Sequence, residues 1–251
     1  TLGRYSNFAK QNGTYVPAQN ANNCTQEVTI NTNYKELSVF RAGNSATDST
    51  AQNATARNLE EFISTTLANG GYYIARFEAS GTTSKITSKY NQTVLTIITQ
   101  PNAAKAAREM YGEVKENNEL VYASDLVNSY AWDTTIAFLQ KVNSDYGNSS
   151  EEGNYHDTTF SYTDITGASK TKAKNSNVIV PTGQTTPVCN IYDMGGNVLE
   201  WTTESYSSTN VPCAVRGGVY DNLFAYSPAG SRNVISDNAN DGIGFRLTLF
   251  M

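Results

Sequence analysis

Three short motifs, each containing glycine, follow one another near the end of the chain and constrain its fold more than any other feature. The first spans residues 192–201 and reads YDMGGNVLEW. The second is RGG at residues 216–218, and the third is GFR at residues 244–246. Glycine permits positive φ angles and the close approach of other backbone. We therefore expect the motifs to fix the backbone of one folded unit, with Phe245 in its core.

The first motif places the carboxylates of Asp193 and Glu200 on either side of residues 195–197, which favour a bent backbone. Hard cations take oxygen ligands from carboxylates and from the carbonyls of bent backbone. The carbonyls of Gly196 and Val198 could turn toward the same point as the two carboxylates. The spacing fits equally well a tight turn in which both carboxylates accept hydrogen bonds from backbone amides.

The sequence and order of the motifs resemble the formylglycine-generating-enzyme-like branch of the C-type lectin fold. Members of that family carry a Tyr-Asp-Met/Leu-x-Gly-Asn-Val-x-Glu-Trp run, then Arg-Gly-Gly, and close on Gly-Phe-Arg. The resemblance is close over the last part of this chain and loose elsewhere, through residues 71–78 and a helix around Trp132. It implies an α+β fold, rich in loops, with small antiparallel or mixed sheets and two or three helices.

A chain of 251 residues can bury one sizeable core, so we expect a single domain over residues 1–251. Residues 143–187 are polar and too many for an ordinary loop. They predict an insertion packed over the sheet that is either functional or poorly ordered. The resembled fold carries its binding surface on the loops before its last strand, which correspond here to a variable-type binding segment at about residues 216–246.

The resemblance favours the cation over the tight turn and implies a calcium site made by Asp193, Gly196, Val198 and Glu200. It also implies structural roles for Trp201, Arg216, Gly217, Gly218, Gly244, Phe245 and Arg246. Arginines beside glycines near a sheet most often fork onto backbone carbonyls or carboxylates. We expect this of Arg216, Arg232 and Arg246, with Glu200 or Asp193 as natural partners.

The cysteines, Cys24, Cys189 and Cys213, lack Cys-x-x-Cys spacing, and His156 is the only histidine. This excludes zinc sites and histidine-based catalytic triads. The resembled fold brings the segments around Cys189 and Cys213 close together, which predicts a disulfide between them. Two buried, reduced thiols are the alternative.

The net charge is −5, and the basic residues form no cluster beyond the alternation of Lys170, Lys172 and Lys174. Nucleic acid is therefore not an expected partner. No apolar run reaches the length that crosses a bilayer, and no charged-then-apolar leader precedes Thr1. We expect no membrane insertion and a place outside the cell, on its surface or on a virion, with any signal removed.

Apolar spacing predicts the main elements. Residues 59–67 carry one helical face, and residues 72–77 read as a strand buried on both faces. Pro101 begins a helix over residues 103–111. Ser124 is a candidate cap for a further helix, whose core stripe contains Trp132.

Residues 214–250 contain no Lys, Glu, Gln, Met or Trp, the five residues that codons of the form any-any-pyrimidine cannot encode. This pattern resembles the variable proteins of diversity-generating retroelements, in which adenines of asparagine codons are mutagenised. A fixed lectin-like loop of polar composition is the alternative. The candidate ligand-binding residues are Tyr220, Asp221, Asn222, Phe224, Tyr226, Asn233, Ile235, Asp237, Asn238, Asn240 and Asp241.

Formylglycine-generating members of the resembled family use two cysteines between RGG and GFR, and this chain has none there. We therefore expect no catalysis, but a protein that displays a diversified surface to a protein or glycan ligand, on a bacterial cell or a phage. One alternative is an oxidase whose thiol has moved to Cys213. Another is a carbohydrate-binding lectin of fixed specificity, although the Glu-Pro-Asn and Gln-Pro-Asp motifs of animal lectins are absent.

Overall fold

The computed structural model describes residues 70–117, 119–144, 146–147, 153–206, 210–224 and 228–250, together with Thr66, Ala68 and three short N-terminal strands. Of these strands, β1 (Phe8–Gln11) pairs antiparallel with β2 (Thr14–Pro17). The third, β3 (Tyr34–Lys35), pairs with the end of a long strand of the main sheet. The helix predicted over residues 59–67 lies outside the described residues, apart from the helical Thr66.

The main sheet brings the three motifs together. Its strands are, in spatial order, β13 (Arg232–Ile235), β12 (Cys213–Arg216), β11 (Leu199–Tyr206) and β14 (Ile243–Phe245). The β11–β14 pair is parallel and the other two pairs are antiparallel. Glu200 pairs with Arg216 on one side and with Gly244 on the other, so each motif contributes one residue to the same row of the sheet.

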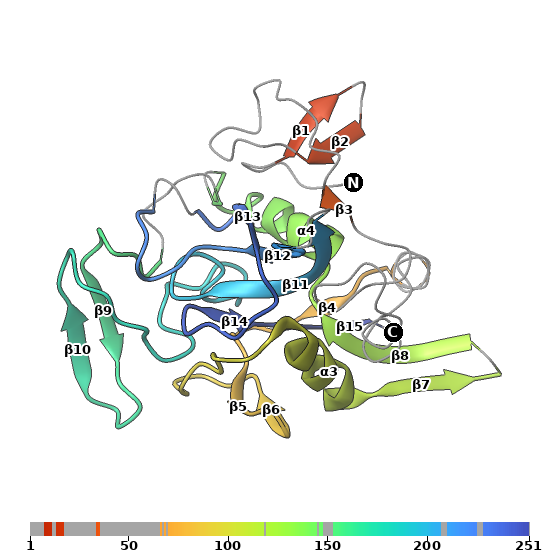
Figure 1. Cartoon of the computed structure of the whole chain (residues 1–251), viewed down its shortest axis with the longest axis horizontal. Coiled ribbons are helices and arrows are strands. Elements are labelled where there is room, and N and C mark those ends of the chain that lie inside the picture. Colours follow the sequence, from red (N-terminus) through yellow and green to blue (C-terminus); the bar gives the residue numbers. More distant parts are fainter. Residues whose placement is uncertain are drawn as a thin grey trace.

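A second, antiparallel sheet lies beside the first (Figure 1). Its order is β4 (Tyr73–Ile74), β15 (Leu247–Phe250), β8 (Glu119–Leu126) and β7 (Glu113–Glu116). Only Arg246 separates β14 from β15, so the chain passes from one sheet to the other at this arginine. The strand predicted over residues 72–77 is shorter than expected. Tyr73 is 61% exposed, because β4 is the edge of the sheet and one of its faces meets solvent.

Two hairpins complete the described strands: β5 (Ser80–Thr82) with β6 (Lys85–Thr87), and β9 (Phe160–Thr163) with β10 (Ser169–Lys172). The β9–β10 hairpin belongs to the predicted insertion and projects from one side of the molecule (Figure 1). The described part of the chain contains two well-formed helices beside these sheets. The α+β class and the C-type lectin fold are therefore as predicted.

Helix α3 (Gln100–Tyr111) follows the prediction. The hydroxyl of Thr99 accepts a hydrogen bond from the amide of Asn102 at 3.4 Å, Pro101 stands in the first turn, and Gly112 ends the helix with φ +69°. Its alanines pack into a cluster that also contains Trp201 and Phe245.

Helix α4 (Ser129–Leu139) begins later than predicted. Its cap is Asn128, whose side chain accepts from the amide of Ala131 at 2.9 Å. Ser124 lies instead in β8, where its hydroxyl donates to the carbonyl of Ala107 at 2.8 Å and accepts from the amide of Tyr111. The predicted cap residue therefore closes the end of α3, because α3 and β8 pack together. Trp132 is fully buried, as predicted for the core stripe of α4.

Three arginines are buried against carboxylates. The guanidinium of Arg246 bonds both oxygens of Glu200, the closest at 2.6 Å, and also the carbonyls of Ala75, Tyr192 and Asp193. This is one of the two partners expected from the sequence. The other two arginines also bond carboxylates, as expected, but not those of Glu200 or Asp193: Arg216 pairs with Asp133 at 2.9 Å, and Arg232 pairs with Glu204 at 2.7 Å. Their carboxylates come from distant segments that the fold brings beside β12 and β13.

Replacing Glu200 with alanine should lower the free energy of unfolding by about 3–5 kcal/mol, because the buried guanidinium of Arg246 would lose the carboxylate that bonds it directly. Urea denaturation followed by tryptophan fluorescence measures the loss. The matched control is Glu109→Ala, which breaks the exposed pair of Lys105 and Glu109 at 3.9 Å. That change should leave the midpoint nearly unchanged. Equal losses in the two variants would contradict a structural role for the buried pair.

Candidate functional site

The predicted binding segment alternates between buried and exposed stretches. Residues 216–219, 228–232 and 242–248 are buried, whereas residues 221–222 and 238–241 are exposed. The residues predicted to be structural all fall in buried positions: Trp201, Arg216, Gly217, Gly218, Gly244, Phe245 and Arg246. The segment thus has a rigid interior and an exposed outer edge.

Close packing explains the glycines of the second and third motifs. Gly217 has φ +78°, and a Cβ there would lie 3.1 Å from the carbonyl oxygen of Met194. A Cβ on Gly244 would lie 3.0 Å from a methyl group of Val198. Both distances are tighter than ordinary van der Waals contact, so side chains at these positions would push the motifs apart.

The two exposed stretches meet at Tyr220. A Cβ on Gly242 would lie 3.7 Å from the ring of Tyr220 and 3.3 Å from the side-chain oxygen of Asn240. Partial burial and the negative charges of Asp241 and Asp221 raise the pKa of Tyr220. An aromatic ring, carboxylates and a carboxamide therefore share one exposed surface, although they come from two loops.

The first loop rests on the insertion. The amide of His156 donates to the carbonyl of Asn222 at 3.0 Å, and the amide of Phe224 donates to Asp157 at 3.1 Å. The ring of Phe224 meets that of Tyr155 edge-on, with 6.5 Å between centroids. Sequence reasoning did not find this support, because nothing local links residues so far apart in the chain. Tyr226 lies outside the described residues.

The second loop is held mainly through its backbone. The carbonyl of Asp237 accepts from the amide of Gln100 at 3.1 Å, and the carbonyl of Asn240 accepts from that of Ile97 at 3.0 Å. Asn233 and Asn238 are exposed. Ile235 is a correction: it is half-buried and packs against the hydrophobic cluster that contains Trp201, because its side of β13 faces the core.

Ile97 is a residue that the sequence did not suggest. It is 71% exposed and has φ +55°, a conformation that β-branched residues rarely adopt. Such outliers concentrate at functional sites. Its amide bonds to Asn240, so its side chain extends the apolar part of the surface beside the second loop. In the sequence Ile97 belongs to the largely apolar run VLTII of residues 94–98, which indicates burial and gave no signal for an exposed side chain.

The predicted disulfide between Cys189 and Cys213 is wrong, since both thiols are free in the structure. Cys213 is buried in β12 with the cluster around Trp201, whereas Cys189 is exposed in the turn of residues 188–191. Proximity of both segments to the first motif therefore did not imply proximity of the two thiols. The alternative of two buried thiols holds for Cys213 alone.

The two carboxylates among the predicted calcium ligands have other partners in this fold. Both oxygens of Glu200 bond Arg246. Those of Asp193 accept hydrogen bonds from the amides of Gly183 and Thr185, the second at 3.1 Å. Asp193 thus has the arrangement of the tight-turn interpretation. As placed, the carboxylates of Asp193 and Glu200 are engaged by protein donors, and the calcium site of Asp193, Gly196, Val198 and Glu200 stays a prediction.

A third buried carboxyl, Glu78, lies in the same region. One of its oxygens accepts from the side chain of Asn197 at 2.8 Å, while the other has no hydrogen-bond partner. Asn197 also bonds Val180 and the side chain of Asn154, so it links the first motif to the insertion. Burial first, then the charges of Asp193 and Glu200, raises the pKa of Glu78 well above its ordinary value. The raised pKa favours the neutral form of Glu78, in which the unpartnered oxygen can carry the proton.

The fold and these motifs define an α+β protein of the C-type lectin fold. The chain belongs to the FGE-sulfatase family, because the family profile, described as sulfatase-modifying factor enzyme 1-like domain, matches residues 4–249. No curated protein matches the chain significantly.

Two solved structures are similar in part. One, titled "Crystal Structure of CarF", has 19% identity and a TM-score of 0.39 over 58% of this chain, which spans only 53% of the CarF chain. The other is Treponema denticola variable protein 1, with 13% identity and a TM-score of 0.35 over 83% of this chain and 75% of that one.

In the described part of the chain, no helix has the length and apolar character needed to cross a membrane.

Glu78→Gln should change the pH dependence of stability. Because the pKa of Glu78 is raised in the folded state, the folded protein holds a proton that the unfolded chain has released. The contribution of this bound proton to stability is complete at a pH below the ordinary pKa of a carboxyl group. It is lost as the pH rises through the raised pKa of Glu78 in the folded protein. Glutamine stays neutral, so the variant should lose less stability than the native protein as pH rises from about 5 to about 8. Thermal melts across that range measure the difference, and melts of the native protein and the variant that shift equally with pH would contradict the role assigned to the carboxyl of Glu78.

An experiment with a chelator tests whether a proton or a metal ion neutralises the buried carboxyl groups of Glu78, Asp193 and Glu200. If the proton acts alone, excess chelator should leave the melting temperature of the native protein unchanged, and added calcium should not raise it. A fall on chelation that calcium reverses would restore the calcium prediction. The Glu78→Gln variant, melted in parallel, is the control, because it keeps the carboxylates of Asp193 and Glu200.

Proposed function

We propose that this protein binds ligands without catalysis, through a variable surface displayed on a C-type lectin scaffold. One observation carries the proposal: residues of the two exposed loops are fixed largely through main-chain bonds. The carbonyls of Asn222, Asp237 and Asn240 accept hydrogen bonds from His156, Gln100 and Ile97. A main-chain bond is available to almost any residue type, so these positions tolerate many side chains.

The chemistry of the surface supports the same proposal. Tyrosine offers large contact area at small entropic cost, and asparagine and aspartate offer adaptable hydrogen bonds. Tyr220, Asp221, Asn238, Asn240 and Asp241 supply both kinds of contact. The ligand is a protein or a glycan on a cell surface, met by a phage or by a bacterium, and the protein acts outside the cell.

The absence of catalysis rests on the missing thiols. Residues 219–243 contain no cysteine, so the pair that formylglycine-generating enzymes use has no counterpart there. Cys213, the thiol that a displaced site would need, is 3% exposed and packs in the core. Neither thiolate chemistry nor soft-metal binding has a pair of accessible sulfurs at this surface.

Randomising the exposed loop positions should leave most variants folded. The test library varies Asp221, Asn222, Asn233, Asn238 and Asp241, and a control library of equal size varies Arg216, Gly217, Gly218, Gly244 and Phe245. Surface changes typically cost within about 0.5 kcal/mol, whereas buried changes of charge or shape cost several times more. Resistance to protease on displayed protein gives the folded fraction. Similar fractions in the two libraries would contradict the division between surface and scaffold.

Diversification predicts a signature in the DNA. The region beside the gene should carry a near-copy of the final coding segment that differs only at adenines, next to a reverse transcriptase gene. Sequencing that region decides the matter without knowledge of the ligand. A gene without such a copy would leave a lectin-like surface of fixed sequence, and the library experiment would still report on its tolerance.

A further inference from the structure

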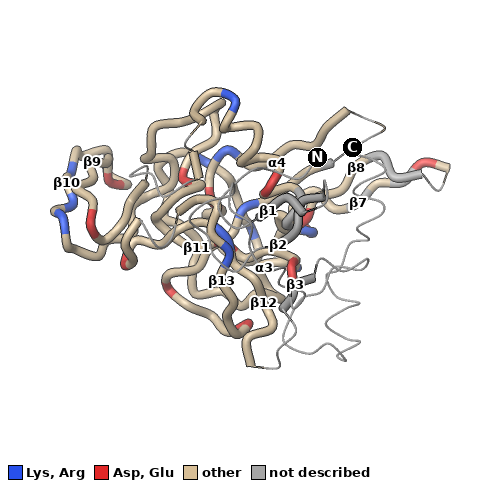
Figure 2. The backbone as a smooth tube through the Cα atoms, turned by 90° about the horizontal axis from the view of Figure 1, so that it is seen from above, with Lys and Arg blue, Asp and Glu red and all other residues tan. Residues whose placement is uncertain are grey.

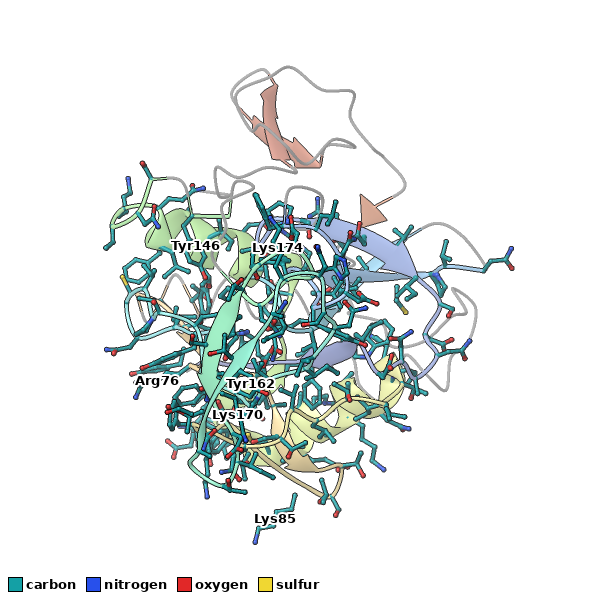
Figure 3. All side chains as sticks on the ribbon, turned by 90° about the vertical axis from the view of Figure 1, so that its left-hand side faces the viewer. Arg76, Lys85, Tyr146, Tyr162, Lys170 and Lys174 are labelled. Carbon is teal, nitrogen blue, oxygen red and sulfur yellow. The ribbon has the colours of Figure 1, made fainter. Side chains whose placement is uncertain are left out.

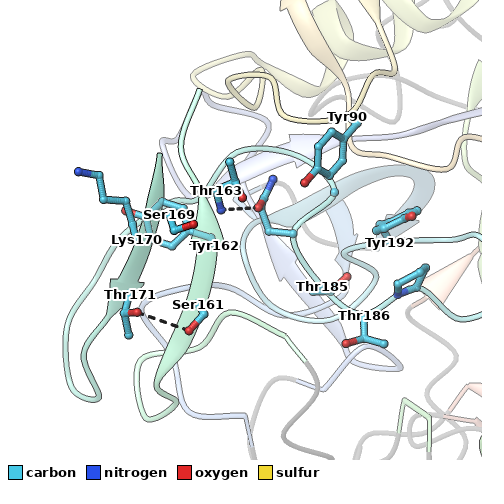
Figure 4. A pocket seen from close by; sticks show the side chains of 13 residues that line it. Tyr90, Ser161, Tyr162, Thr163, Ser169, Lys170, Thr171, Thr185, Thr186 and Tyr192 are labelled. Atoms are coloured by element: carbon cyan, nitrogen blue, oxygen red, sulfur yellow. Dashed lines mark hydrogen bonds between the residues drawn. The ribbon is translucent and has the colours of Figure 1, made fainter. Parts of the chain in front are cut away.

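A second candidate site lies far from the variable surface in sequence, beside the β9–β10 hairpin. A cleft of about 760 Å³ opens between this hairpin and residues 183–187. Figure 4 shows the hairpin residues on one side and Thr185, Thr186 and Tyr192 on the other, with Tyr90 above them and Lys170 pointing away. Tyr162 and Lys170 of the hairpin lie on the face turned toward the viewer in Figure 3. The volume is in the range of sites that hold small ligands, roughly 300–1,000 Å³.

The walls of the cleft are fixed by hydrogen bonds. The side chain of Gln184 accepts from the amide of Thr163 at 2.7 Å and so ties the hairpin to the opposite wall (Figure 4). Asn91 donates to the carbonyl of Asp164 at 2.9 Å, at the end of β9. Asp193 holds the amides of Gly183 and Thr185. A ligand would therefore enter a preformed cleft and would not have to order its walls.

Aromatic rings form the inner side. Tyr192 packs on Phe77 with 4.8 Å between ring centroids, and Tyr90 lies 6.2 Å from Phe77. A Cβ on Gly183 would stand 2.7 Å from the ring of Tyr90, so only glycine lets this wall approach the rings. Tyr90 is nevertheless 52% exposed, which leaves ring surface open to a ligand.

The remaining lining is polar and almost uncharged. Hydroxyl groups dominate it, among them the exposed Ser169, Thr171 and Thr186. None of the lining residues is acidic, and Lys170 is the only basic one. Its ammonium group lies 3.8 Å from Asp164, which offsets its charge. Figure 2 shows charges of both signs along this hairpin. Such a site offers little to a phosphate or another strong anion, which would need several uncompensated cations.

The exposed ring of Tyr90 beside neutral hydrogen-bonding groups matches one ligand chemistry. A pyranose has an apolar face of C–H groups that packs on an aromatic ring, and a rim of hydroxyls that exchange hydrogen bonds with hydroxyls and amides. We propose that this cleft binds a neutral oligosaccharide. The site belongs to residues outside the variable segment, so its specificity is the same whatever the loops of residues 220–224 and 233–241 carry.

Saturation-transfer NMR with four neutral hexasaccharides (maltohexaose, cellohexaose, chitohexaose and mannohexaose) tests the proposal on the full chain. At least one should receive saturation, and isothermal titration then gives its Kd. Tyr90→Ala should weaken that Kd at least tenfold by removing the exposed ring. Ser169→Trp should do the same by filling the cleft. The matched control is Tyr111→Ala, which removes a tyrosine of similar exposure, 55%, from the end of α3, outside the cleft lining.

The proposal would be overturned if none of the four sugars received saturation, or if both cleft variants bound with unchanged affinity. It would also be overturned if the acidic hexagalacturonate bound more tightly than every neutral sugar. Circular dichroism melts confirm that the variants are folded. Alanine at Asp221, Asn222, Asn238 and Asp241 together should leave hexasaccharide binding intact. Loss of binding in that variant alone would place the sugar on the variable surface and likewise overturn the assignment to the cleft.

Discussion

The buried contact between Arg246 and Glu200 holds the scaffold together. Arg246 stands where the chain leaves one sheet for the other, and its guanidinium reaches the carbonyls of Ala75 and Tyr192 as well as the carboxylate of Glu200. One side chain therefore links β11, the start of the second sheet and the first motif. The N–H groups of Arg246 bond several acceptors at once because the guanidinium is a planar fork. Lysine lacks this fork and could not replace the arginine.

The same contact constrains the charges around it. Glu78 and Asp193 share the region with Glu200, and Arg246 is the one cation among the causes that shift the pKa of Glu78. Three ionised carboxylates would leave two negative charges buried without compensation. Asp193 accepts hydrogen bonds from backbone amides, and the raised pKa of Glu78 favours its neutral form. Packing of the motifs is thus coupled to the ionisation of Glu78 as well as to shape.

The sequence predicted what local patterns and whole motifs encode. The fold class follows from the resemblance of the three motifs to a known family, whereas α3 with its proline and its terminal glycine, and the buried stripe of α4, follow from short-range spacing. Contacts between residues far apart in the chain could not be predicted from the sequence. The partner of Arg216 is Asp133, and Asp193 bonds residues 183 and 185 within the insertion, which no spacing rule indicates. The predictions of Ser124 as a helix cap and of Ile235 as a ligand-binding residue were wrong for a related reason. Tertiary packing placed Ser124 in a strand and turned Ile235 toward the core.

The insertion has a role that neither its composition nor its length reveals. It lacks a hydrophobic core of its own, and a buried lysine organises part of it: Lys172 donates to the carbonyls of Tyr155, Thr158 and Ser176. Burial lowers the pKa of this amine, and the carbonyls offset the lost hydration. From this base, His156 and Asp157 support the loop of residues 220–224, while β9 and β10 form one wall of the cleft. A single polar insertion therefore supports both the proposed variable surface and the proposed sugar-binding cleft. Because the hydrogen bonds from the insertion to Asn222 and Phe224 use the main chain of the loop, changes of the exposed side chains of Asp221 and Asn222 leave these bonds in place.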